Sequence, residues 1–202
     1  NCALYNVKVL GDNGSGAWSW IANGIVWAAD NGAKVINMSL GGSTGSSTVE
    51  DAVNYAWNKG VVLVAAAGNS GSSAPSYPAY YANVIAVAAT DQNDNKASFS
   101  NYGTWVDIAA PGVSILSTAP DHRNRIWGFG VKYGTLSGTS MASPHVAGVA
   151  GLVWSTGACG TNSCVRSRIE NGADKIAGTG TYWANGRLNA YNAVVGRTGS
   201  SP

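Results

Sequence analysis

The chain has 202 residues and 45% of them are hydrophobic, so it is long enough to form one globular domain with a substantial core. Only 11% of the residues are charged and the net charge is +2, which argues against nucleic acid or an anionic membrane as a partner. No apolar run reaches the roughly 18 to 20 residues that span a bilayer, and the N-terminus NCALYNVKVL lacks the pattern of a signal peptide. We therefore expect a single soluble domain.

Strand-like and helix-like segments alternate from the N-terminus onward. YNVKVL at residues 5–10 predicts a strand, and the apolar residues of segment 18–31 recur at the spacing of a helix. KVINMSL at residues 34–40 predicts the next strand. Ser47 and Glu50 then fit a capping box, S-T-V-E, which predicts the start of a second helix.

The second half continues the same alternation. The apolar run VVLVAAA at residues 61–67 does not alternate with polar residues, which is typical of a strand buried on both faces of a parallel sheet. NVIAVAAT at residues 83–90 predicts a further strand, and a helix is expected over residues 140–154. Shorter strands are predicted at VDIAA, SILST and KYGTL, and shorter helices at VRSRIEN and RLNAYNAVV. The pattern predicts an α/β fold of three layers around a mainly parallel central sheet.

The three cysteines do not suggest a metal site, because the chain has no CxxC pair and no histidine cluster. Cys159 and Cys164 flank GTNS, which has the composition of a turn, so we expect a short-loop disulfide, with a reduced pair as the alternative. Two interpretations stay open for Cys2: a small buried residue beside a strand, or a cysteine whose partner lies in sequence outside this chain.

Ser140 lies where the strand-like KYGTL turns through SGT into a helix. Backbone N–H groups at a helix start are unpaired and favour negative charge, so an oxyanion would be stabilised there. Taken locally, Ser140 is either a nucleophile or a simple N-cap. His145 is not suited to act as its base, because five helical residues separate the two side chains by about 140°. His122 lies in a loop that nothing directs toward Ser140.

The stretch GTSMASPHVAG at residues 138–148 resembles the nucleophile signature of the subtilisin-like serine proteases. Further segments resemble that family in the same order along the chain: VKVLGDNGSG, VINMSLGG, VVLVAAAGNSG, YPAYYANVIAVAATD, ASFSNYG and DIAAPG. Near the C-terminus, YWANGRLNAYNAV is similar to the thermitase branch. The resemblance covers nearly the whole chain and implies a subtilisin-like fold.

The resemblance implies roles for two residues of the reaction centre. Ser140 corresponds to the acylating serine, and Asn69 in AAAGNSG corresponds to the side-chain donor of the oxyanion hole. The implied chemistry is physically reasonable, because an amide N–H and the backbone N–H of Ser140 can both face the charge of a tetrahedral intermediate.

Two further segments match the family's substrate cleft. The segment implied to pair with the extended substrate backbone is Ser39, Leu40 and Gly41. The segment implied to form one wall of the pocket for the residue before the scissile bond is Ala66, Ala67 and Gly68. Neither contains an acidic residue, so we expect apolar or aromatic side chains to be preferred there over Lys or Arg.

The sequence departs from the family in one respect that matters for activity. The family's D-T/S-G segment, which carries the triad aspartate, and its H-G-T-H segment, which carries the base histidine, occur nowhere in this chain. We therefore expect residues 1–196 to be the C-terminal portion of a catalytic domain whose N-terminal part is missing, and residues 197–202 to be a linker or frayed tail. The chain alone is expected to be inactive. The alternative is a non-catalytic peptide-binding fragment or an inactive protease homologue.

The resemblance also bears on cofactors and partners. It implies no cofactor for catalysis, but a structural Ca²⁺ or Na⁺ bound by the carbonyls of Ala79, Tyr81 and Val84, with Asp107 as a further ligand. The implied partners are a protein or peptide substrate and the missing N-terminal segment. A secreted monomer is expected.

Two segments remain outside this interpretation. GDNGSG, which follows a strand-like segment, suggests a dinucleotide-binding loop, but the third glycine of that motif would fall at Ser19 and the next strand ends without the acidic residue for the ribose. The segment 121–133 is longer than expected at this point of the family; it either shapes the substrate cleft or is a tolerated surface insertion, which we favour.

Overall fold

The computed structural model of the chain describes residues 2–119 and 132–200. Its elements, in chain order, are α1 (Trp18–Asp30), β1 (Val35–Met38), α2 (Ser47–Asn58), β2 (Val62–Ala66), β3 (Val84–Thr90), β4 (Ile108–Pro111), β5 (Ile115–Thr118), β6 (Tyr133–Leu136), α3 (Thr139–Ser155), α4 (Asn162–Gly172) and α5 (Ala190–Val195). Except for the first strand, this order is the predicted alternation. Across the described residues, no helix has both the length and the apolar character to cross a membrane.

The central sheet has four parallel strands in the order β1-β2-β3-β4. β5 and β6 form a separate antiparallel pair, which leads into α3. Strands β2 and β3 are buried along their whole length, as the unbroken apolar runs predicted.

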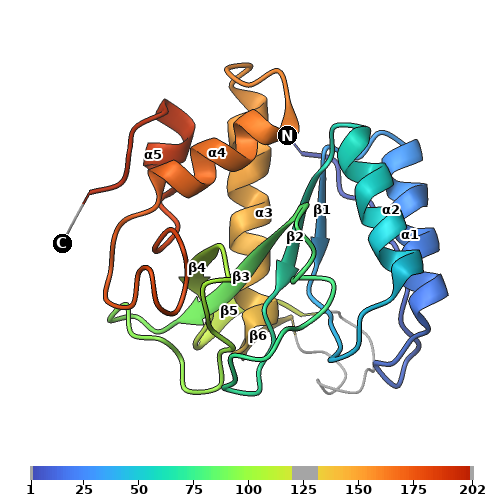
Figure 1. The fold of residues 1–202 in the computed structure, drawn as a ribbon, viewed down its shortest axis with the longest axis horizontal. Coiled ribbons are helices and arrows are strands. Elements are labelled where there is room, and N and C mark those ends of the chain that lie inside the picture. The colour runs from blue at the N-terminus through green and yellow to red at the C-terminus, as the bar shows by residue number, and fades with distance from the viewer. Residues whose placement is uncertain (1, 120–131, 201–202) are drawn as a thin grey trace.

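Helices cover the sheet on both faces, as alternate residues of one strand show. Leu63 and Ala65 of β2 pack in a core cluster with the buried faces of α1 and α2, which lie side by side (Figure 1). Val62 and Val64 of the same strand pack in a second cluster with α3, α4 and α5. The predicted three-layer α/β fold is therefore confirmed.

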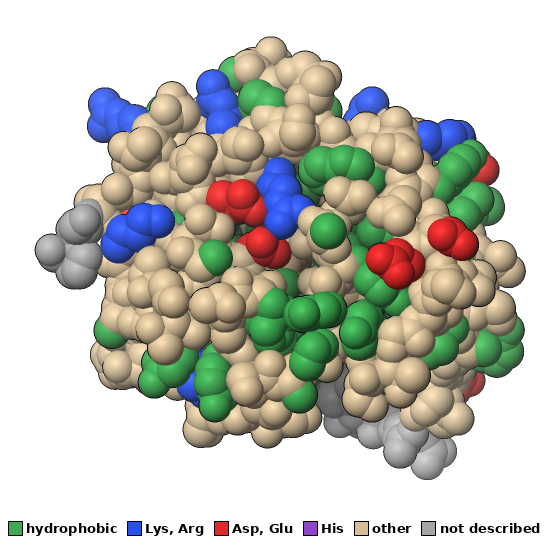
Figure 2. Space-filling model, in the orientation of Figure 1, with side chains coloured by type: hydrophobic (Ala, Val, Ile, Leu, Met, Phe, Trp, Pro, Cys, Tyr) green, Lys and Arg blue, Asp and Glu red, His purple; other side chains and the backbone are tan. Residues whose placement is uncertain are grey.

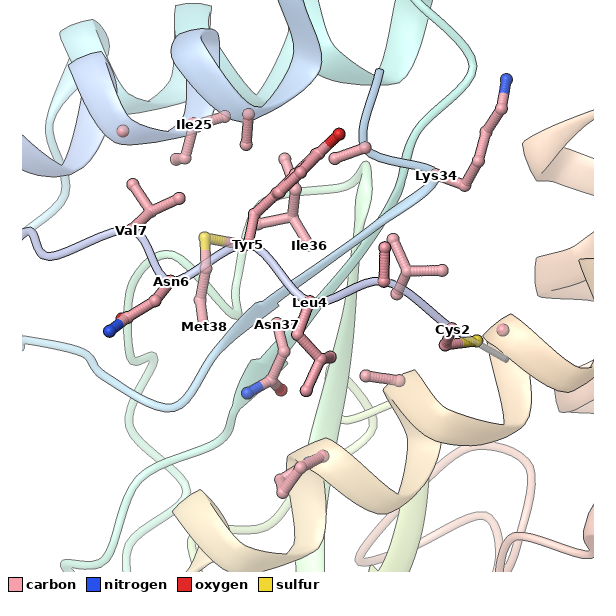
Figure 3. A pocket seen from close by; sticks show the side chains of 18 of the residues that line it. Cys2, Leu4, Tyr5, Asn6, Val7, Ile25, Lys34, Ile36, Asn37 and Met38 are labelled. Atoms are coloured by element: carbon pink, nitrogen blue, oxygen red, sulfur yellow. The ribbon is translucent and has the colours of Figure 1, made fainter. Parts of the chain in front are cut away.

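The strand predicted at residues 5–10 is absent. Figure 3 shows this segment crossing in front of β1, with the side chains of Leu4, Tyr5 and Val7 beside a groove. The groove has a volume of about 890 Å³ and is lined by this segment, α1, β1 and α3. Within the described chain, the backbone of residues 2–9 makes no hydrogen bond. A strand forms only when its backbone hydrogen-bonds to a neighbouring strand. The apolar pattern of YNVKVL does not specify such a neighbour, so it predicted a strand that does not form here.

The predicted capping box at Ser47 is also wrong. Helix α2 begins at Ser47 with Ser46 as its N-cap residue, and no side chain caps it. A capping box needs Glu or Gln three positions after the cap residue. With Ser46 as the cap, that position is Val49, and Glu50 lies four positions on. Here the N–H of Ser46 instead donates to the hydroxyl of Tyr81 at 2.8 Å, and that hydroxyl donates back to the carbonyl of Ser46.

The cysteines follow the prediction in one case and differ from it in the other. Cys159 and Cys164 form the expected disulfide, which joins the end of α3 to α4. Cys2 is a free, exposed thiol, so the interpretation of it as a buried residue is wrong.

At the other end of the chain, the N–H of Gly199 donates to the carbonyl of Asn171, and the N–H of Lys175 donates to the carbonyl of Ser200.

Candidate active site

Ser140 stands in the first turn of α3, two residues after Gly138, the N-cap residue of this helix. In the part of the chain that the structure describes, no group accepts a hydrogen bond from its backbone N–H. That N–H is one of the unpaired donors at a helix start, where the helix dipole favours negative charge. The Ser140 hydroxyl makes only a long contact, 3.4 Å, to the carbonyl of Ser39, so little holds it away from an incoming base.

Asn69 lies on the loop after β2 and faces the start of α3. Its side-chain Oδ1 accepts hydrogen bonds from the backbone N–H of Thr139 at 2.8 Å and from the Thr139 hydroxyl at 2.9 Å. Because Thr139 occupies the oxygen, the amide Nδ2 is turned the other way. That Nδ2 makes no hydrogen bond to any described residue, so it is free to donate to a ligand.

Gly138 leaves open the space between the two free donors. A methyl carbon placed on Gly138 would lie 3.7 Å from the Nδ2 of Asn69 and 3.7 Å from the backbone N of Ser140. Both donors therefore border one point beside the nucleophile, which a side chain at residue 138 would begin to fill. Two converging N–H groups of this kind form an oxyanion hole.

The segment after β1 is joined to the nucleophile turn. The Ser39 hydroxyl donates to the carbonyl of Ser140 at 2.8 Å and accepts from the Asn37 amide at 2.9 Å. The next two residues, Leu40 and Gly41, make no backbone hydrogen bond to the described part of the chain. Their N–H and C=O groups are thus available to an added strand, and pairing with a substrate backbone remains a prediction.

A pocket of about 290 Å³ opens beside Ser140 and Asn69. Its walls come from the Leu40–Ser43 segment, from the loop after β2, and from Ala74, Pro75 and Ser76. Ala66 and Gly68 line it, whereas Ala67 is fully buried and does not. That this pocket takes the residue before the scissile bond remains a prediction. No charged side chain lines this pocket. The surface in Figure 2 is likewise largely uncharged, with its charged side chains in small, separate groups.

The described residues contain no base for Ser140. His145 is exposed on α3, and its Nδ1 lies 2.8 Å from the carbonyl of Met141 one turn back, while the Ser140 hydroxyl makes no hydrogen bond to it. His122 and residues 121–131 of the long segment fall outside the described residues. The groups gathered here are thus a serine hydroxyl and two N–H donors without acceptors, an arrangement suited to a nucleophile beside an oxyanion hole.

Asp107 does not fit the predicted cation ligand. Its Oδ1 accepts from the guanidinium of Arg166 at 2.8 Å, and its Oδ2 from the backbone N–H of Ala86 at 2.7 Å. Burial is the largest influence on this carboxyl and raises its pKa to about 6, although Arg166 opposes the shift. The described residues hold no group of three acidic, cysteine or histidine side chains suited to a metal. A site built from the carbonyls of Ala79, Tyr81 and Val84 remains a prediction.

Comparison with known proteins agrees with this geometry. The sequence matches the subtilase family over residues 1–195. This chain belongs to the subtilase family. It is 63% identical over 192 residues to thermitase from Thermoactinomyces vulgaris, an alignment that covers 95% of this chain and 65% of that protein. It is 57% identical over 195 residues to the thermophilic serine proteinase of Bacillus sp. (strain AK1), covering 96% and 46%.

A solved protease structure supports the fold. The structure of the prenylagaramide maturation protease PagA matches with a TM-score of 0.78 and 28% sequence identity, over 91% of this chain and 70% of that one. The chain spans between about half and two thirds of the length of the curated relatives above.

Sequence reasoning missed two side chains that contact predicted site residues. Thr139 orients Asn69, and its only signal was its place next to Ser140 in the matched motif. Arg166 pairs with Asp107 from 59 residues away, and it lies in a helical segment that carries no motif.

Proposed function

We propose that this chain carries the nucleophile, the oxyanion hole and the substrate pocket of a serine endopeptidase. The observation that supports the proposal is the convergence of Asn69 Nδ2 and the Ser140 N–H beside the Ser140 hydroxyl. The hydroxyl oxygen would attack the carbonyl carbon before the scissile bond, while a base takes its proton. The two N–H donors would stabilise the oxyanion, the amine would leave with the proton, and water would hydrolyse the acyl-enzyme on Ser140.

The base belongs to the part of the proposal that lies outside this chain. Neither histidine nor aspartate reaches Ser140 within the described residues, and thermitase continues over sequence that this chain does not cover. We infer that sequence outside this chain supplies the triad Asp and His, and that the chain by itself does not turn over peptides. The disulfide between Cys159 and Cys164 favours an oxidising compartment, which fits a secreted enzyme.

The experiment treats the intact protein, meaning this chain together with the sequence that supplies the triad Asp and His, with a fluorophosphonate. Intact mass and peptide mapping then locate the label. We expect a single label on Ser140, and no label in the Ser140→Ala variant. Casein hydrolysis should decrease in proportion to the fraction of the protein that is labelled. A label on another residue, or hydrolysis that survives Ser140→Ala, would refute the assignment. Peptide binding without labelling would favour the alternative function, a non-catalytic peptide-binding protein.

A further inference from the structure

The loop that carries Asn69 is held by one buried side chain. Asn101, which is 5% exposed, follows β3 in the sequence and lies beneath this loop. Its Nδ2 donates to the carbonyl of Ala67 at 2.9 Å, and its Oδ1 accepts from the N–H of Ser70 at 2.9 Å and of Ser72 at 3.3 Å. The backbone N–H of Asn101 donates to the carbonyl of Gly68 at 2.9 Å.

These four hydrogen bonds enclose Asn69. They engage residue 67 and residue 68 before it, and residue 70 and residue 72 after it. Gly68 has φ +104°, a backbone conformation that residues other than glycine rarely adopt. Because glycine is conformationally free, the loop around it needs such support. It is also closely packed there: a carbon added to Gly68 would lie 2.5 Å from the Nδ2 of Asn101.

Thr139 and Asn101 hold different parts of the oxyanion donor. Thr139 fixes the rotation of the Asn69 side chain through its Oδ1. Asn101 fixes the backbone from which that side chain projects. We propose that Asn101 is a positioning residue for the oxyanion hole. It holds the Nδ2 of Asn69 where this group can donate a hydrogen bond to the developing oxyanion. This inference rests on the proposed function of Asn69 and Ser140.

The proposal predicts an effect on turnover more than on substrate binding. An oxyanion-hole donor acts most strongly as charge develops in the transition state, so its displacement lowers kcat. Asn101 also lines the pocket beside Asn69, but it makes no hydrogen bond to the predicted substrate-pairing backbone at Leu40 and Gly41. Its substitution is therefore expected to change KM less than kcat.

The test compares Asn101→Ala and Asn101→Asp in the intact protein, with kcat, KM and the thermal midpoint measured for each. Alanine removes all three side-chain bonds, and we expect kcat to fall roughly tenfold with KM changed less than about threefold. Aspartate keeps an acceptor for the N–H groups of Ser70 and Ser72, so it should retain more of kcat. It also keeps the test open should the alanine variant fail to fold.

Asn162→Ala is the matched control. Asn162 is 8% exposed, and its Nδ2 donates to the carbonyls of Trp57 and Val61, so it too is a buried amide that holds a loop. This loop lies between α2 and β2, at the other end of β2 from Asn69. In Asn162→Ala we expect the thermal midpoint to fall while kcat stays unchanged. An equal loss of kcat in Asn101→Ala and Asn162→Ala would overturn the proposal, because the loss would then follow from reduced stability in general.

A double-mutant cycle with Asn69→Ala decides whether Asn101 acts through Asn69. Removal of an oxyanion donor should by itself lower kcat by about 10²- to 10³-fold. In that background we expect substitution of Asn101 to change kcat less than about twofold. The same fall of kcat in both backgrounds would overturn the proposal. If Ser140→Ala or Asn69→Ala leaves kcat unchanged, the proposed function fails instead, so the two failures are distinguishable.

Discussion

The Oδ1 of Asn69 accepts two hydrogen bonds from one residue, Thr139, through its backbone N–H and its hydroxyl. The same hydroxyl accepts from the N–H of Gly68 at 3.1 Å. One buried threonine therefore ties the start of α3 to the loop after β2. This tie sets which end of the Asn69 amide faces the nucleophile.

Thr139→Val tests that relationship. Valine keeps the shape and the backbone N–H but removes the hydroxyl, so one of two bonds to Asn69 is lost and the N–H of Gly68 is left without its acceptor. We expect kcat to fall roughly tenfold with little change in KM, since the donor is misplaced for the transition state rather than for the substrate. Steady-state kinetics on a peptide substrate checks this.

Thr90→Val is the control for that substitution. Thr90 is 1% exposed in β3, and its hydroxyl has no hydrogen-bond partner in the described residues. Loss of an unsatisfied buried hydroxyl should leave kcat unchanged and the thermal midpoint equal or higher. Equal kinetics for the two valine variants would contradict the role of the Thr139 hydroxyl.

Local sequence accounts for the start of α3 well and for its surroundings only in part. The glycine, threonine and serine of residues 138–140 form a contiguous motif, so the helix start is readable from the chain itself. The predicted role of Ser140 as a nucleophile comes from the family resemblance, because local sequence alone also allows a simple N-cap. Asn101 and Arg166 act on residues far away in sequence, and no periodicity encodes such contacts. The prediction of a strand at residues 5–10 was wrong for a related reason. Strand formation depends on a neighbouring strand, which a single segment does not specify.

The uncharged pocket predicts the residue preferred before the scissile bond. A Lys or Arg side chain bound there would lose water without meeting a carboxylate, because no acidic residue lines the pocket. We expect kcat/KM to be at least roughly tenfold higher after Phe or Leu than after Lys in matched peptides, a difference of about 1.4 kcal/mol. A neutral polar residue, Gln, serves as the size control for Lys. Comparable cleavage after Lys and Phe would disprove the predicted preference.

The disulfide between Cys159 and Cys164 should stabilise the chain without acting on the reaction. It closes a loop with a sequence separation of only 5, for which the chain-entropy relation gives about 2 kcal/mol. We expect Cys159→Ala/Cys164→Ala to lower the free energy of unfolding by that amount in urea, measured in the Ser140→Ala background to prevent autolysis. Reductant should destabilise the parent but not the double variant. An unchanged urea midpoint would contradict this account.

Asp107 gives the stability a pH dependence whose sign follows from its burial. The folded state raises the pKa of this carboxyl from 3.8 to about 6, with burial as the largest cause. Between these pH values the folded chain binds more protons than the unfolded chain, so stability falls as the pH rises through that window. At 1.36 kcal/mol per pKa unit, the loss amounts to at most about 3 kcal/mol.

Asp107→Asn removes this titration but keeps the shape of the side chain. The variant also loses the ion pair with Arg166, which shifts its free energy of unfolding relative to the parent. This shift does not vary with pH once the carboxyl of the parent is charged. We therefore expect the stability of the parent, relative to Asp107→Asn, to decrease between about pH 4 and pH 6.5 and to level off above it. Urea unfolding in the Ser140→Ala background measures the difference, and Asp51→Asn, on the exposed face of α2, is the control. Parallel curves for the parent and Asp107→Asn across this range would show that Arg166 outweighs burial at this carboxyl.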